Sequence, residues 1–269
     1  MPGEGILKKR TAALLLALVF FTIMPGRGEE TTKAAAADAA GLWQKALGIF
    51  QKNSDAYPEK ISILSEVLDR RDQPDSVTQL FFTMSMDAKG QMHTELTRAL
   101  KNGKDISEKM KKNVEIRNLN ENNTPKKEAS LTVSLSDSPF NPGQQKNVSF
   151  RASEEKQMLF GHSCRRFDFT YQTEIIRKGA SDKLTWTGMA WLEEDSGMPL
   201  KLEFSMAPLP KRIRSLWTTY LYEVSQPDRW VLKKIMITGQ GGFLFIKKRF
   251  RSTTTFSDYR RQPQRGDKK

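Results

Sequence analysis

The sequence predicts an α+β fold in which N-terminal helices cover a curved antiparallel β-sheet, an incomplete barrel of about eight or more strands. Three observations lead to this prediction. Apolar residues recur at helical spacing near the N-terminus, and the apolar period changes to two from Val77 onward. Turn residues then separate the alternating runs in meander order, without an internal repeat.

Residues 34–71 are predicted to be helical. One apolar face follows the i, i+3, i+4, i+7 spacing of a helix and consists of Trp43, Ala46, Leu47 and Phe50. A second short helix is expected to begin at Pro58, because proline is tolerated in a first helical turn. Its apolar positions are Ile61, Leu64 and Leu68. We therefore expect two helices before the sheet begins.

Strands are predicted wherever apolar and polar residues alternate. The expected strands span residues 77–86, 92–100, 164–175, 184–192, 200–206, 217–224 and 230–238. The acidic turn Glu193–Gly197 indicates a hairpin. Gly239–Gly242 is interpreted as a hairpin turn rather than a phosphate-binding loop, since no βαβ unit surrounds it. Asp105 and Glu108 resemble a capping box before a short helical turn.

The N-terminus predicts export. Lys8, Lys9 and Arg10 precede an apolar run, residues 11–24, that is shorter than the roughly 20 residues a membrane-spanning helix needs. We therefore interpret residues 1–28 as a signal peptide, with an uncleaved membrane anchor as the alternative. Residues 29–260 are expected to form a single domain, which includes a long loop at about 118–147, and residues 261–269 a basic disordered tail.

The net charge of +13 is concentrated near the C-terminus, because residues 247–269 contain nine basic and two acidic residues. A local basic segment in an exported protein does not indicate a nucleic-acid partner. Cys164 is the only cysteine, so no intramolecular disulfide can form. We expect its thiol to be buried like a small apolar side chain, with a reactive thiol as the alternative.

Sequence patterns for catalysis are weak. Residues 161–165, Gly-His-Ser-Cys-Arg, nearly match the hydrolase elbow G-x-S-x-G, but Arg165 replaces the last glycine and a strand pattern follows. Two histidines and one cysteine cannot complete a tetrahedral zinc site without carboxylates. Glu193, Glu194 and Asp195 could act as paired carboxylates, but solvated charge is the usual role in such a turn. We expect no enzymatic activity, no metal and no cofactor.

Large apolar residues occupy both faces of the strands predicted between residues 217 and 238. Ordinary packing between a helix and a sheet is one explanation, and a sheet that encloses an apolar ligand cavity is the other. The predicted cavity lining shows clean one-face alternation on neighbouring strands and consists of Phe167, Phe169, Tyr171, Leu200, Leu202, Phe204 and Met206.

A basic cluster follows the apolar residues 243–246 and consists of Lys247, Lys248, Arg249 and Arg251. Two interpretations remain open. These charges can keep an exposed edge strand from pairing with another chain. Alternatively, they contact an anionic membrane surface or a protein partner, at about 1 kcal/mol per basic side chain near a membrane.

Residues 188–201, Gly-Met-Ala-Trp-Leu-Glu-Glu-Asp-Ser-Gly-Met-Pro-Leu-Lys, combine a strand end, an acidic turn and a Pro-Leu-Lys strand start. This segment resembles the periplasmic outer-membrane lipoprotein-sorting proteins, the LolA-like superfamily. The resemblance implies an incomplete antiparallel barrel of about eleven strands, lidded by helices, with a cavity for acyl chains of lipids or lipoproteins. Arg98 is the candidate for the family's gating arginine, and the basic C-terminal segment departs from the family's pattern.

The resulting functional expectation is a monomeric periplasmic carrier or chaperone that buries the acyl chains of a lipid or an acylated lipoprotein. The alternative is an envelope sensor or interaction module, which would dock on a membrane protein or an anionic membrane surface through its basic C-terminal strand.

Overall fold

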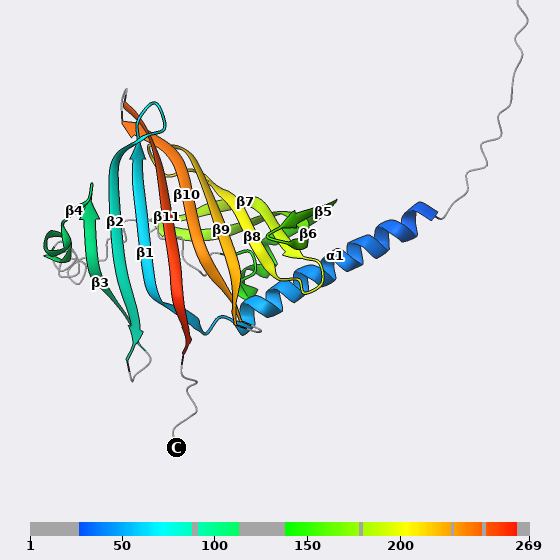
Figure 1. Ribbon diagram of the computed structural model, residues 1–269. Helices are drawn as coiled ribbons and strands as arrows, with labels where there is room; N and C mark the ends of the chain where they lie inside the picture. Colours follow the sequence, from blue (N-terminus) through cyan, green and yellow to red (C-terminus); the bar gives the residue numbers. More distant parts are fainter. Residues whose placement is uncertain are drawn as a thin grey trace, which may run out of the picture.

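One helix and one large β-sheet make up most of the structure (Figure 1). The computed structural model describes residues 27–87, 91–112, 138–177, 180–226, 229–243 and 246–262. The elements are the α-helix α1 (Arg27–Lys52), the 3₁₀ helix η1 (Pro142–Asn147) and the strands β1 (Ala56–Leu68), β2 (Pro74–Met86), β3 (Met92–Lys101), β4 (Lys104–Asp105), β5 (Val148–Leu159), β6 (His162–Arg177), β7 (Ala180–Glu193), β8 (Pro199–Ala207), β9 (Ile213–Gln226), β10 (Arg229–Phe243) and β11 (Ile246–Arg261). A turn of helix also covers residues 107–112.

All eleven strands belong to one antiparallel sheet in the order β4-β3-β2-β1-β11-β10-β9-β8-β7-β6-β5. Consecutive strands pair with each other except β4 and β5, which are the two edges of the open sheet. The last strand returns to pair with the first, in a register that runs from Ala56↔Arg261 to Leu68↔Arg249. The predicted curved antiparallel sheet is therefore confirmed, with eleven strands and without closure into a barrel.

Helix α1 packs across one face of the sheet, which we call the inner face. Its predicted apolar stripe is confirmed, since Trp43 and Ala46 are fully buried in the core cluster. The Trp43 ring lies 4.7 Å from Phe140, 4.4 Å from Phe150 and 5.6 Å from Phe167, between ring centroids. These contacts fix the helix over β5 and β6, and Figure 1 shows that its first turns extend beyond the sheet.

The second predicted helix is wrong, because residues 56–68 form strand β1. Ile61, Leu64 and Leu68 have helical spacing, but Ile61 also has a polar residue on each side, as an apolar position in an alternating strand does. β1 pairs with β2 on one side and β11 on the other, and these two ladders outweigh the local helical pattern. A single helix therefore precedes the sheet in the described part of the chain.

The interpretation of Gly239–Gly242 as a turn is also wrong. Gly239, Gln240 and Gly241 pair with both β9 and β11, and Gly242 pairs with β11. The last pair of the hairpin is Phe243↔Ile246. A Cβ atom at Gly239 would lie 2.5 Å from the Phe250 ring and 2.7 Å from the Ser215 carbonyl oxygen. Glycine is needed here because the Phe250 ring covers the backbone, not because the chain turns.

The other strand predictions are confirmed, with ends that differ by several residues. Residues 1–26 of the predicted signal peptide, residues 118–137 of the predicted loop and residues 263–269 of the predicted tail lie outside the described residues. The domain boundaries therefore stay predictions. Among helices in the part of the chain that the structure describes, none is long and apolar enough to cross a membrane.

Replacing Trp43 with alanine is expected to destabilise the fold by about 3–5 kcal/mol, the usual cost of removing a large buried aromatic side chain. The measurement is the urea midpoint of unfolding, followed by circular dichroism. Gln44→Ala is the matched control, because Gln44 is the exposed neighbour of Trp43 on the same helix. Similar midpoints for the two variants would show that Trp43 does not anchor α1.

Candidate functional site

A row of aromatic rings crosses the inner face from β6 to β10. Successive ring centroids are 4.1–6.3 Å apart, so each ring contacts the next. The row consists of Phe169, Tyr171, Trp186, Phe204, Tyr220, Tyr222 and Trp230. Its first members lie in the packed core, and its last three reach a cavity.

This cavity has a volume of about 500 Å³ and lies where the C-terminal end of α1 meets β9, β10 and β11. Its floor is buried and mostly apolar, formed by Tyr220, Tyr222, Trp230, Val231 and Leu232. Its walls and rim are partly or fully exposed and are formed by Phe50, Gln51, Asn53, Ser54, Ala56, Asn141, Pro142 and Tyr259. The cavity therefore changes from apolar at the floor to polar at the opening. We call it the inner cavity.

Asn53 fixes the end of the helix against the sheet. Its side-chain amide donates to the Ile49 carbonyl at 2.9 Å, and its side-chain oxygen accepts from the Trp230 backbone N–H at 3.2 Å. The Trp230 indole N–H donates to the Pro199 carbonyl oxygen at 2.5 Å, so Trp230 is held at both its backbone and its ring. The Tyr259 hydroxyl donates to the Leu232 carbonyl. The shape of the inner cavity is thus set by hydrogen bonds as well as packing.

Burial dominates the chemistry of the tyrosines in this region. Burial, with smaller contributions from Tyr220 and Tyr259, raises the pKa of Tyr222 well above its ordinary value, although a hydrogen bond with Ser138 opposes this. Burial also raises the pKa of Tyr259, with a further contribution from Glu223. Both phenols are therefore neutral at physiological pH and cannot act as anionic groups.

None of the seven predicted lining residues borders the inner cavity. Five of them are fully buried parts of the core cluster, and Met206 packs against it; the five are Phe167, Phe169, Tyr171, Leu202 and Phe204. Leu200 belongs to a separate cluster with Cys164 and Trp191. The β7–β8 register shifts between Trp191 and Leu192, and this irregularity separates Leu200 from Leu202. Contact of the seven residues with a ligand stays a prediction.

The sequence drew attention to the large residues of β9 and β10 without assigning them to a face. Alternation alone could have placed Tyr220 and Tyr222 on one face of a strand. No pattern pointed to Gln51, Asn53 or Asn141, because they meet the floor only through the docking of a helix end and a loop.

Three of the four basic residues in the C-terminal cluster form ion pairs within the chain. Lys248 Nζ lies 2.6 Å from Asp75, Arg249 Nη1 lies 2.8 Å from Asp72, and Arg251 Nε lies 2.6 Å from the buried Glu66. Lys247 has no ion pair with any described residue. The partners lie on β1, β2 and the turn between them, so most of the charge is neutralised locally.

The edge-strand interpretation of these residues is wrong, because β11 lies between β1 and β10 in the interior of the sheet. Lys247, Lys248 and Arg249 instead border a polar cavity of about 600 Å³ at the end of the sheet opposite the inner cavity. β1 spans the interval with 13 residues, or about 40 Å at 3.3 Å per residue. The basic residues therefore cannot touch a small ligand in the inner cavity.

The segment that resembled a hydrolase elbow continues directly into β6. Ser163 donates to Glu194 at 2.7 Å, while His162 Nδ1 lies 2.5 Å from Glu193. The serine and the histidine are thus each paired with a different carboxylate rather than with each other. Burial raises the pKa of the Cys164 thiol to about 11, which confirms the expectation of a buried cysteine with little thiolate character.

The same polar cluster holds helix α1. Arg165 Nη1 lies 2.8 Å from Asp38, and Lys45 Nζ donates to the Asp195 carbonyl at 3.0 Å. Gly197 has φ of 75° and approaches Lys45 so closely that an added Cβ atom would lie 2.5 Å from the Lys45 Cβ. The acidic turn between β7 and β8 is therefore a structural contact with α1 and not a fully solvated loop.

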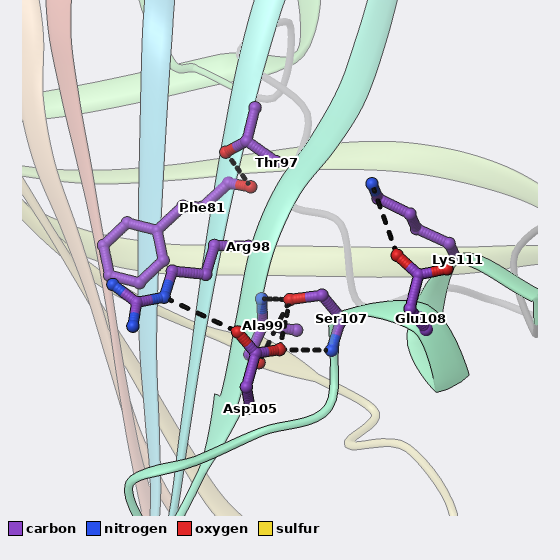
Figure 2. Close-up of polar contacts among 8 residues, drawn as sticks. All are labelled: Phe81, Thr97, Arg98, Ala99, Asp105, Ser107, Glu108 and Lys111. Atoms are coloured by element: carbon purple, nitrogen blue, oxygen red, sulfur yellow. Dashed lines mark hydrogen bonds and ion pairs between the residues drawn. The ribbon is translucent and has the colours of Figure 1, made fainter.

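Arg98 lies away from the inner cavity. It stands opposite Phe81 in the β2–β3 ladder, next to a register shift, and its Nε lies 3.9 Å from Asp105 (Figure 2). Asp105 accepts hydrogen bonds from the backbone and the hydroxyl of Ser107 and so caps the helical turn that follows. Glu108 faces Lys111 instead of reaching back to Asp105, so only half of the predicted capping box forms.

No protein-family model matches the chain, and no curated protein matches it. Among solved structures, a DUF1329 family protein from Desulfovibrio piger aligns over 85% of this chain and 95% of its own, at 10% identity and a TM-score of 0.35. A chain of the Pseudomonas aeruginosa MucA/MucB complex aligns over 84% and 99%, at 9% identity and a TM-score of 0.21. These similarities are too low to carry an argument about function.

Replacing Arg251 with methionine is expected to cost about 1 kcal/mol of stability at neutral pH, because Glu66 would remain buried without its partner. The hydrogen bond from Arg251 lowers the pKa of Glu66 below its ordinary 4.5. The stabilisation from this pair is fully present above the pKa of Glu66 in the unfolded state. It disappears as the pH falls through the pKa of Glu66 in the folded state. The difference in the free energy of unfolding between wild type and variant, measured with urea, should therefore become smaller below about pH 4.

Lys247→Met is the matched control for Arg251→Met and should leave the free energy of unfolding nearly unchanged. Equal losses in the two variants, or a loss in Arg251→Met that persists at about pH 3, would contradict a stabilising pair between Arg251 and Glu66.

Proposed function

We propose that this protein is a non-enzymatic envelope protein that binds an acyl chain, of a lipid or an acylated lipoprotein, in the inner cavity. The observation that carries the proposal is the cavity itself, which joins a buried aromatic and aliphatic floor to a solvent-exposed rim. Its volume of about 500 Å³ lies within the range of about 300–1,000 Å³ typical of ligand pockets.

The hydrophobic effect is large enough for reversible binding. Each buried methylene contributes about 0.8 kcal/mol, so ten buried methylenes contribute about 8 kcal/mol. Association and the ordering of the chain offset part of this gain. The remainder corresponds to dissociation constants in the micromolar to millimolar range, which suits a carrier that must also release its cargo.

Periplasmic location and carrier activity complete this proposal. They rest on the predicted signal peptide and on the resemblance of residues 188–201 to lipoprotein-sorting proteins. Docking through the basic C-terminal strand is the second candidate. The ion pairs of Lys248, Arg249 and Arg251 reduce the charge available to an anionic surface, so the structure favours the cavity over docking.

Ala56→Phe is expected to block binding, because Ala56 lines the inner cavity and a phenyl ring there would occupy its volume. The measurement is native mass spectrometry of gently purified protein, together with displacement of the fluorescent probe N-phenyl-1-naphthylamine from the pure protein. Ala207→Phe is the matched control, since Ala207 is exposed at the end of β8 and away from the cavity.

Wild type and Ala207→Phe should retain lipid and bind the fluorescent probe, and Ala56→Phe should lose at least about tenfold in affinity. A wild-type protein that carries no lipid and ignores both the probe and added acyl ligands would contradict the proposed function. Unchanged binding in Ala56→Phe would place the ligand elsewhere in the chain.

A further inference from the structure

The inner cavity has no charged lining. Its thirteen lining residues are apolar, aromatic, amide or hydroxyl side chains, and none of these described residues is Lys, Arg, His, Asp or Glu. Charged residues that flank the lining residues in sequence carry both signs and include Lys52, Asp55, Glu223 and Arg229. None of these four lines the cavity, and an Asp55 carboxylate oxygen lies 3.8 Å from Arg261 Nε.

Some polar side chains at the rim already form hydrogen bonds within the chain, and the Gln51 amide is available for a ligand. Asn53 uses its amide in the contacts with Ile49 and Trp230, and the Ser54 hydroxyl donates to the Gln51 carbonyl at 2.8 Å. The Gln51 side-chain amide is exposed and has no hydrogen bond to any residue that the structure describes. It offers one acceptor and two donors next to the opening, the set that hydroxyl and ester groups require.

No charged side chain of the described residues lines the opening to act as a counter-charge for an ionised head group, and the nearby Arg229 guanidinium already donates to the Tyr259 carbonyl at 3.3 Å. A carboxylate or phosphate that follows its acyl chain into the opening loses water without gaining an ion pair, and this desolvation costs more than the transfer of a neutral hydroxyl or ester. The raised pKa values of Tyr222 and Tyr259 indicate that burial near the floor disfavours the charged forms of these phenols.

We propose that the inner cavity selects ligands whose head group is polar but uncharged, such as a monoacylglycerol or another acyl ester, over anionic lipids and fatty-acid anions. The acyl chain lies against Tyr222, Trp230 and Leu232, and the neutral head group hydrogen bonds with Gln51 at the rim. This inference rests on the proposed acyl-chain binding and specifies the class of ligand for the same site.

The test compares two ligands with the same acyl chain, monomyristoylglycerol and the myristate anion. Equilibrium dialysis with the purified full-length protein at neutral pH, below the aggregation limit of each ligand, gives both dissociation constants. We expect myristate to bind at least about tenfold more weakly. Equal affinities, or tighter binding of myristate, would overturn the selectivity and leave acyl-chain binding intact. Failure of both ligands to bind would instead remove the proposed function.

Gln51→Lys tests where the head group lies. A lysine at the rim is expected to strengthen myristate binding by about two- to fivefold, the value of an exposed ion pair, without strengthening monomyristoylglycerol binding. Gln44→Lys adds the same charge to an exposed position of α1 that does not line the cavity, and it should change neither constant. The placement at Gln51 is wrong if the two lysine variants behave alike.

Discussion

The packing of Trp43 against the sheet is the contact on which the rest of the structure depends. Cys164 is the single cysteine, so no disulfide can hold helix α1 on the sheet. The helix is held instead by Trp43 between rings from β5, β6 and the segment before η1, with polar contacts from the acidic β7–β8 turn. Because the anchor lies over β5 and β6, the C-terminal end of α1 is directed toward β9 and β10, where the inner cavity lies.

The inner cavity continues the packed core. The same row of rings that is buried under α1 from Phe169 to Phe204 continues through Tyr220 to Trp230, where the helix ends at Lys52 and the chain turns into β1. Packing rings are thus left with one face toward the cavity rather than toward another side chain. The same apolar surface stabilises the fold where α1 covers it and becomes available for a ligand where the helix stops.

Much of the sheet could be predicted from sequence, since β2, β6 and β8 alternate clearly and turn residues separate them. The failures have physical causes that no local pattern reveals. Residues 56–68 have helical spacing, and they form a strand because they pair with β2 and with β11, the latter almost 200 residues later. Leu200 separates from Leu202 because the β7–β8 register skips Leu200, between Pro199 and Lys201 of β8. The rim of the inner cavity was not predicted, because Gln51, Asn53 and Asn141 are polar residues without a repeating pattern that meet only after the helix docks.

Both ends of the β1–β11 ladder carry ion pairs, but in the described part of the chain only one end borders a cavity with an uncharged lining. At one end, ion pairs join β11 to β1, β2 and their connecting turn, and Glu66 is buried in the pair with Arg251. At the other end, about 40 Å away along β1, an uncharged cavity opens beside the same strands. A buried carboxylate is tolerated only with its partner, so Glu66 of β1 depends on its pair with Arg251 of β11. Near the inner cavity, the pairs Lys60–Asp258 and Glu59–Arg260 join the same two strands, so ion pairs support the register between β1 and β11 at both ends while the cavity lining itself is uncharged.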